Sequence, residues 1–273
     1  MNLEQYADNL ILKDGIWYSR LNSPVSYPEH GNESCFVLEE ISFWFKHRNN
    51  CIIETVKKFA TEKLFFDIGG GNGYVASGLE KAGIEAVLVE PGINGIANAK
   101  KRNLKNLVCA TFEDGNFKKN SLPNIGLFDV VEHINQDLNF LQQVYQCLKP
   151  GGLIFITVPA YQFLWSNEDN DAGHQRRYTL KAIQKKLQMA GFSVKYKTYI
   201  FSFLPLPIFF FRSLPSKLGL NKKSNDIDKH KREHKNKGLF NRILDLLLNW
   251  ELEIIERKKR VLFGGSCLIV GSK

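Results

Sequence analysis

The chain has 273 residues, of which 44% are hydrophobic and 24% are charged. This length and mixture exclude a disordered, collagen-like or disulfide-stapled chain and predict one sizeable globular domain. The excess of 37 Lys and Arg over 28 Asp and Glu gives a formal net charge of +9. Such a charge suits an anionic partner, whether nucleic acid, a phosphate group or an acidic membrane surface.

The 5 cysteines are scattered along the chain without any Cys-x-x-Cys pair. The spacing predicts neither a disulfide framework nor a zinc site, and we expect no metal. The first residues carry acidic side chains and no long apolar run, so they do not resemble a secretory signal. Together these features favour a cytoplasmic protein.

The first 62 residues predict an N-terminal helical cap over the rest of the chain. An aromatic cluster at Phe43, Trp44 and Phe45 opens a helix that we expect to run through residue 58. A short basic patch that includes Arg48 follows the cluster.

From about residue 63, short apolar runs alternate with amphipathic segments, which is typical of an α/β sheet with mostly parallel strands. The predicted strands are 63–68, 86–90, 106–110, 125–131, 153–158 and 192–199, and the predicted helices are 74–82, 93–102, 136–148 and 179–190. A final strand at 262–270 is expected to run antiparallel. The predicted fold is therefore a doubly wound, Rossmann-like sheet of seven strands, with a core at 63–200, an insert at 201–260 and the last strand within 261–273.

The most informative run is FFDIGGGNG at residues 65–73, a buried strand that ends in a glycine-rich turn before a helix. Glycines allow positive φ and let a ligand lie against the backbone at the start of a helix. Glu90 ends the next strand, where a carboxylate can accept both hydroxyls of a ribose. The glycines concerned are Gly69, Gly70, Gly71 and Gly73.

Two cofactors use this arrangement. Residues 71–76 match the Gly-x-Gly-x-x-Ala dinucleotide fingerprint, which leaves an NAD(P)-dependent oxidoreductase open. Asp67 favours the other cofactor, because a carboxylate at the strand tip repels a pyrophosphate and attracts the ammonium and sulfonium groups of S-adenosylmethionine.

Four motifs in order resemble those of the class I S-adenosylmethionine-dependent methyltransferases. They are FFDIGGGNG at 65–73, VLVEP at 87–91, FDVVEHI at 128–134 and LKPGGLIFITVP at 148–159. The resemblance implies that Asp67 and the glycine loop hold the methionyl part of the cofactor and that Glu90 holds its ribose.

The resemblance also implies roles for other residues. Phe112 and Glu113 are the candidates for adenine recognition, because Thr111 occupies the position where many relatives have an aspartate. Phe128 and Asp129 lie where cofactor and acceptor meet in similar proteins, although Phe128 could equally be a core residue. Arg48 is the candidate ligand of the methionyl carboxylate.

Methyl transfer is an in-line displacement, so a protein supplies alignment, desolvation and, for a hydroxyl acceptor, a base. His133 follows the fourth strand, as a histidine does in the ubiquinone-pathway O-methyltransferases that this segment resembles, and its neutral imidazole can take a proton near pH 7. Glu132 and His174 are alternative bases. The competing interpretation is that Glu132 and His133 only fix the local structure through hydrogen bonds.

The segment after residues 153–158 should cover the methyl group, because ligands of open sheets bind beyond the carboxyl ends of the strands. Tyr161 and Trp165 are candidates to wall an acceptor pocket. Arg176 and Arg177 are candidates to bind a phosphate or carboxylate on the acceptor. A basic surface turn is the alternative interpretation.

Residues 199–211 form the most apolar stretch of the chain. The stretch contains two prolines and is shorter than the roughly 20 residues that a membrane span needs, so we do not expect a transmembrane helix. Between residues 212 and 242 there are ten Lys and Arg against three Asp and Glu, so most of the net charge lies there. Segment 199–223 therefore predicts contact with an anionic membrane surface, with a substrate lid or a dimer contact as alternatives. Residues 239–255 predict an amphipathic helix.

We expect an enzyme that binds S-adenosylmethionine and methylates a small-molecule, lipid-linked or saccharide acceptor on oxygen. A nucleic-acid methyltransferase is a rival because of the charge, but the chain lacks the Asn-Pro-Pro-aromatic or Asp-Pro-Pro-aromatic motif that serves a flipped base. A non-catalytic, membrane-associated cofactor-binding module is the third alternative. The sequence does not predict the oligomeric state.

Overall fold

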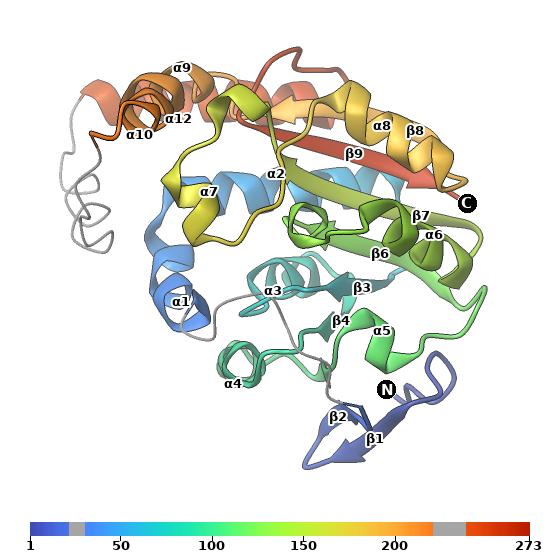
Figure 1. Ribbon diagram of the computed structural model, residues 1–273. Coiled ribbons are helices and arrows are strands. Elements are labelled where there is room, and N and C mark those ends of the chain that lie inside the picture. The colour runs from blue at the N-terminus through green and yellow to red at the C-terminus, as the bar shows by residue number, and fades with distance from the viewer. Residues whose placement is uncertain (22–30, 221–238) are drawn as a thin grey trace.

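The computed structural model describes residues 1–21, 31–220 and 239–273, which form a single sheet with helices on both faces (Figure 1). The strand order is β1-β2-β5-β4-β3-β6-β7-β9-β8. The seven strands from β5 to β8 in this order are the predicted Rossmann-like sheet, and β9 runs antiparallel to both of its neighbours. The predicted fold class is confirmed, with two strands more than expected.

The core elements lie within a few residues of their predicted bounds. The strands are β3 (Leu64–Ile68), β4 (Glu85–Val89), β5 (Asn106–Cys109), β6 (Leu122–Phe128), β7 (Leu148–Pro159), β8 (Ser193–Ile200) and β9 (Ser266–Ser272). The predicted helices are α3 (Tyr74–Lys81), α4 (Ile93–Lys101), α6 (Asp137–Cys147) and α8 (Leu180–Met189). Two short helices, α5 (Phe112–Gly115) and α7 (Asn167–Asp171), were not predicted. Strand β6 ends three residues before the prediction, because Asp129 adopts a φ of 58° and turns the chain into a 3-10 turn at Val131–His133.

The two additional strands come from the N-terminus and correct the prediction that residues 1–62 are helical throughout. Strands β1 (Leu10–Lys13) and β2 (Ile16–Ser19) form a hairpin, and β2 continues the sheet beside β5. The turn is Asp14-Gly15, in which both residues have positive φ. Asp-Gly is a strong hairpin signal, because this turn needs left-handed backbone at both central positions.

Two N-terminal helices do form, α1 (Gly31–Ile41) and α2 (Phe43–Phe59). Helix α2 begins where predicted, because the Ser42 side chain accepts a hydrogen bond from the backbone N–H of Trp44. It packs against α3 and also against α12 (Leu239–Glu256), the helix predicted at 239–255. The N-terminal cap is therefore attached to the rest of the domain through contacts of α2 with both α3 and α12.

The apolar stretch after β8 folds into α9 (Pro205–Ile208), a π-helical turn (Phe209–Ser213) and α10 (Leu214–Lys217). This segment lies with α12 at one margin of the molecule (Figure 1). None of the described helices combines the length and the apolarity needed to cross a membrane.

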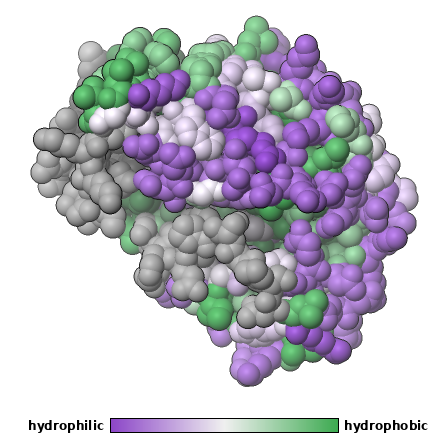
Figure 2. Space-filling view, viewed as in Figure 1, coloured by the Kyte–Doolittle hydropathy of each residue, from purple (hydrophilic) through white to green (hydrophobic). Residues whose placement is uncertain are grey.

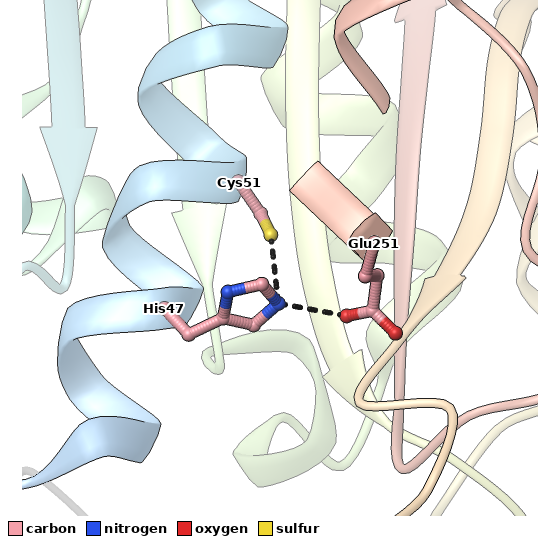
Figure 3. A group of neighbouring side chains, drawn as sticks. All are labelled: His47, Cys51 and Glu251. Atoms are coloured by element: carbon pink, nitrogen blue, oxygen red, sulfur yellow. Dashed lines mark hydrogen bonds and ion pairs between the residues drawn. The ribbon is translucent and has the colours of Figure 1, made fainter. Parts of the chain in front are cut away.

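A fully buried carboxylate joins α12 to α2 (Figure 3). Glu251 of α12 lies 2.8 Å from Nε2 of His47, whose ring also contacts the Cys51 thiol at 3.4 Å. The backbone N–H groups of Phe201 and Ser202 donate to the two oxygens of the same carboxylate, at 2.6 and 2.8 Å. These donors keep the pKa of Glu251 below its ordinary value despite its burial.

His47, Cys51 and Glu251 have ligand atoms close enough to hold a metal ion. Both oxygens of Glu251 are already satisfied by hydrogen bonds from protein donors. We therefore interpret the cluster as a hydrogen-bonded contact that holds α12 against α2.

Replacing Glu251 should destabilise the fold, because His47 and two backbone N–H groups would remain buried without their acceptor. We expect Glu251→Ala to lower the free energy of unfolding by about 3 kcal/mol. Since the folded pKa of Glu251 lies below its ordinary value, its stabilisation is present above that value and is lost as the pH falls.

Urea unfolding of the unmodified protein and of Glu251→Ala between about pH 4 and pH 7 measures this loss of stability. The matched control is Glu253→Ala on the exposed side of the same helix, which should change stability by less than about 0.5 kcal/mol. Equal losses in the two variants would contradict the assignment.

Candidate active site

A cavity of about 680 Å³ lies at the carboxyl ends of β3, β4 and β6. Parallel pairing of β3 with both neighbours brings these strand ends together. Twelve residues singled out from the sequence line the cavity: Arg48, Asp67, Gly69, Gly70, Gly71, Glu90, Phe112, Glu113, Phe128, Asp129, His133 and His174. The strand-end arrangement inferred from the motifs is therefore the arrangement that the fold builds.

The glycine loop lies directly on the cavity. Gly69 and Gly71 have φ of 68° and 55°, which side chains rarely adopt. A Cβ on Gly70 would lie 2.5 Å from the Asp67 carboxylate and 2.4 Å from Leu88. These positions leave bare backbone facing the cavity, as a closely bound ligand requires.

Gly73 is not among the residues that line the cavity. It combines a φ of 72° with a Cβ position only 2.5 Å from Leu104. Gly73 lets the start of α3 pack against the segment after α4. Its contact with the cofactor stays a prediction.

Asp67 is the next-to-last residue of β3 and is completely buried. Among the described residues, no hydrogen bond of regular geometry reaches either of its carboxylate oxygens. Burial raises the pKa of Asp67 to about 7, although the positive charge of Arg48 lowers it. A buried, poorly satisfied carboxyl at the cavity wall suits a cationic ligand.

Glu90 stands at the end of β4, as predicted. Its two oxygens accept hydrogen bonds from the backbone N–H groups of Gly71, at 3.0 Å, and Gly92, at 2.8 Å. The carboxylate thus fixes the glycine loop and also presents acceptor oxygens to the cavity.

The wall beyond Glu90 is aromatic. Phe112 lines the cavity and stacks on Phe117 with ring centroids 5.2 Å apart. Glu113 lies beside it in the wall, while the Thr111 hydroxyl caps the short helix α5. Phe128 both lines the cavity and stacks on Phe65 in the core, so its two alternative roles coexist.

Arg48 reaches the cavity from α2 and pairs with Asp129, with 2.7 Å between Nε and the carboxylate. The Thr157 hydroxyl donates to the other oxygen of Asp129 at 2.9 Å. The Arg48 guanidinium also lies 5.4 Å from the centre of the Trp44 ring. The ion pair joins the N-terminal cap to the end of β6 across the cavity.

Helix α1 adds a second part of the cap to the wall through Cys35 and Glu39. Arg102, at the end of α4, pairs with Glu39 at 2.9 Å and donates to the backbone oxygen of Asn72 at 3.1 Å. This contact ties α1 to the glycine loop.

Glu132, His133 and His174 come together where predicted. Their ligand atoms lie within 4.8 Å of one another, and the two histidine rings meet edge to face with centroids 4.9 Å apart. The His174 Nδ1 lies 2.8 Å from Asp169, which leaves Nε2 to act as a base or to ligate a metal ion. The fold therefore brings together three residues that were proposed separately as bases, and their atoms are also close enough to hold a metal ion.

The two histidines line the cavity, whereas Glu132 lies completely buried behind them. Burial and the nearby Asp129 raise the pKa of Glu132 well above its ordinary value. Burial and the neighbouring His174 lower the pKa of His133 below its ordinary 6.5. His133 is therefore neutral near pH 7, and Glu132 does not face the space where an acceptor would lie.

Four predicted acceptor residues do not line the cavity. Arg176 pairs with Asp137 and Arg177 pairs with Asp169, each at 2.7 Å. Trp165 donates to Asn170, and Tyr161 stacks on Tyr199. These side chains hold the loop after β7 in place, so the structure does not bring them to the cofactor residues.

Several lining residues were missed from the sequence: Cys35, Glu39, Phe45, Asn72, Tyr74, Ile134, Phe140 and Ala172. Trp44 and Phe45 belong to the aromatic cluster of residues 43–45, which matches no known motif and therefore gave no sign of a binding role. Asn72 lies inside the glycine loop, and only its bonds to Glu39 and Asn98 distinguish it from a turn residue.

Residues 44–197 match the family described as methyltransferase domain. The chain belongs to this family. The match spans the cavity residues from Arg48 to His174, and the resemblance to class I S-adenosylmethionine-dependent methyltransferases is thereby confirmed.

Two relatives and one solved structure extend the comparison. Ubiquinone biosynthesis O-methyltransferase of Rattus norvegicus is 31% identical over 100 residues, which cover 33% of this chain and 29% of the relative. A probable S-adenosylmethionine-dependent methyltransferase of Mycolicibacterium smegmatis is 21% identical over 179 residues, 63% of this chain and 68% of the relative. The structure of Haemonchus contortus phosphoethanolamine N-methyltransferase 2 in complex with S-adenosylmethionine superposes with a TM-score of 0.56 and 19% identity, covering 91% of this chain and 58% of that one.

The chain thus spans less than a third of the length of the rat relative, and the likeness to the Haemonchus structure concerns the fold. The cavity fits S-adenosylmethionine, the cofactor of the class I methyltransferases that the chain resembles. Asp67 and the bare loop backbone suit a cationic amino acid, and Glu90 suits a ribose. Phe112 offers an apolar wall for a base.

The affinity for S-adenosylmethionine should depend on the ionisation of Asp67. Its pKa of about 7 in the free protein should fall when the cation binds, because opposite charge stabilises the carboxylate. Binding then releases a proton, and affinity should rise by up to about tenfold per pH unit between about pH 5 and pH 7.

Isothermal titration calorimetry in two buffers of different ionisation enthalpy measures both quantities. Asp67→Asn should bind more weakly and lose the pH dependence over this range. A pH-independent affinity in the unmodified protein would overturn the role given to Asp67.

Proposed function

We propose that the protein transfers the methyl group of S-adenosylmethionine to an oxygen atom of an uncharged, largely apolar acceptor, either a small molecule or a lipid-linked or saccharide compound. The observation that carries this proposal is the pair His133 and His174 on the cavity wall, beyond the residues that suit the cofactor. A neutral imidazole at that place can take the proton of a hydroxyl group.

The charges of the cavity wall support an uncharged acceptor. Among the lining residues that the structure describes, Arg48 is the one Lys or Arg, and it is already paired with Asp129. The lining carboxyl groups are more numerous and comprise Glu39, Asp67, Glu90, Glu113 and Asp129. A phosphate or carboxylate on the acceptor would meet this excess of negative charge without a free cation to bind it.

The apolar lining beside the histidines supports an acceptor with a hydrophobic body. Trp44 and Phe45 of the cap and Ile134 and Phe140 beyond β6 line the same cavity. Burying apolar surface contributes roughly 25 cal/mol per Å², so such walls favour a ring or hydrocarbon over a polar chain.

In this proposal the bound cofactor supplies a methyl group activated by its sulfonium charge. Asp67 and the glycine loop hold its methionyl part, and Arg48 with Asp129 fixes the end of β6 against the cap. His133 would accept the proton of the acceptor hydroxyl while the oxygen replaces the sulfur on the methyl carbon, so that the carbon–sulfur bond breaks and a neutral thioether leaves. The cap and the aromatic walls exclude water from this step.

The test is incorporation of label from methyl-labelled S-adenosylmethionine into fractionated extract, comparing lipid, saccharide, small-molecule and nucleic-acid fractions. Label in a lipid, saccharide or neutral small-molecule fraction supports the proposal. Label in nucleic acid would favour the rival raised by the net charge. Cofactor binding without incorporation into any fraction would favour a non-catalytic module, and NADH binding in its place would favour an oxidoreductase.

With an acceptor in hand, His133→Asn should lower kcat by roughly 100-fold or more while leaving the affinity for S-adenosylmethionine unchanged. Because His133 must be neutral to act, kcat should fall at low pH through a pKa below 6.5. Stopped-time assays across pH measure both effects. If His174→Asn removes the low-pH limb and His133→Asn keeps it, His174 is the base instead.

A further inference from the structure

Exposed apolar side chains gather at one margin of the molecule. Figure 2 shows hydrophobic residues over α9 and α10, the helices at the upper left of Figure 1. Eight large apolar side chains there or on α12 are at least half exposed: Leu206, Phe210, Phe211, Leu218, Leu220, Ile243, Leu246 and Trp250. We call these eight residues the apolar margin.

Helix α12 has two apolar faces, and the fold uses one. Leu248 and Ile255 are buried against the core and, with Leu244 and Leu252, form a cluster that also contains Phe201 after β8. Ile243, Leu246, Leu247 and Trp250 are exposed, with the helical spacing of a second stripe. A surface helix of a globular domain needs only one such stripe, so the second stripe is available for a partner.

The aromatic side chains of the margin protrude strongly. Phe211 is 80% exposed, Phe210 57% and Trp250 53%. Phe and Trp are favoured at the boundary between lipid headgroups and acyl chains, where an apolar helix face can insert without spanning the bilayer.

Positive charge accompanies the margin. Arg212 and Lys217 lie within the same helical segment as Phe210 and Phe211. In the sequence, residues 212–242 contain ten Lys and Arg against three Asp and Glu, which accounts for seven of the nine net charges of the chain. Juxtaposed basic and apolar residues favour a surface that contains anionic lipids.

We propose that the apolar margin inserts into the headgroup region of an anionic lipid bilayer and holds the protein at the membrane surface. The margin is also connected to the cavity. The Ser213 hydroxyl donates to the backbone oxygen of Leu164 at 2.7 Å, and Arg212 pairs with Glu168 at 2.5 Å. Both partners belong to the segment between β7 and α8 that also carries His174, so the helices of the margin are in contact with a segment that contributes to the cavity wall. This inference goes beyond methyl transfer and holds whatever the acceptor is.

The test uses the full chain and extruded vesicles of phosphatidylcholine, with or without 30% phosphatidylglycerol as the probe for anionic lipid. We expect co-sedimentation with the anionic vesicles that weakens as salt is raised. Phe210→Ser combined with Phe211→Ser should lower the partition coefficient by about tenfold or more, since two inserted side chains are lost.

The matched control is Ile93→Ser, which removes an apolar side chain that is 74% exposed on α4, away from the margin. It should leave vesicle binding unchanged. As a second readout, brominated lipid should quench tryptophan fluorescence in the protein but much less in Trp250→Phe.

Three results would overturn the proposal. One is absence of binding to anionic vesicles; another is equal loss of binding in the control variant. The third is a concentration-dependent dimer in sedimentation velocity that the double Phe variant abolishes while vesicle binding is absent, because the margin would then be an interface between two copies of the chain.

Discussion

Two adjacent residues of α2 hold the cap on the sheet, and the part of the cavity wall that the cap contributes depends on both. Arg48 points to the cavity and pairs with Asp129 at the end of β6, while His47 bonds Glu251 of α12. Each contact places a charge or a polar ring in a buried setting, where an unpaired partner is costly. Helix α2 is therefore fixed between the catalytic end of the sheet and the C-terminal helix. Trp44 and Phe45 form cavity wall because the same helix carries them.

The chemistry of the cavity follows from where it lies. Parallel pairing directs the ends of β3, β4 and β6 to one edge, so Asp67, Glu90 and Asp129 face one space. Three carboxyl groups together would repel one another, and the protein offsets this by different means at each. Burial raises the pKa of Asp67 and so favours its neutral form. Glu90 accepts hydrogen bonds from two backbone N–H groups, and Asp129 is paired with Arg48. The result is a site prepared for a cation, which is the charge that S-adenosylmethionine carries.

The sequence predicted what depends on local pattern. The strands, the glycine loop and the acid after β4 repeat at fixed spacings, and their strand-end location follows from the sheet type. It did not predict which arginines are free. Arg176 and Arg177 are the residue type that binds anions, yet both are neutralised by acidic residues. Arg176 pairs with Asp137, which is distant in the sequence, and Arg177 pairs with the nearby Asp169. Glu39 and Phe140 were missed for a related reason, because they reach the cavity through the packing of α1 and α6 and carry no motif. The Asp14-Gly15 turn is a local signal for the β1–β2 hairpin, although the hairpin was not predicted.

The place of β9 has a consequence for how the chain is made. Strand β9, formed by Ser266–Ser272, lies between β7 and β8, and all seven of its residues are buried. Strand β8 reaches the sheet by pairing with β9, since the two are hydrogen-bonded along Ser193–Ile200. A nascent chain therefore carries β8 without its sheet neighbour until β9 has also left the ribosome. The segment between β8 and β9, which carries the apolar α9, must remain unaggregated during that interval.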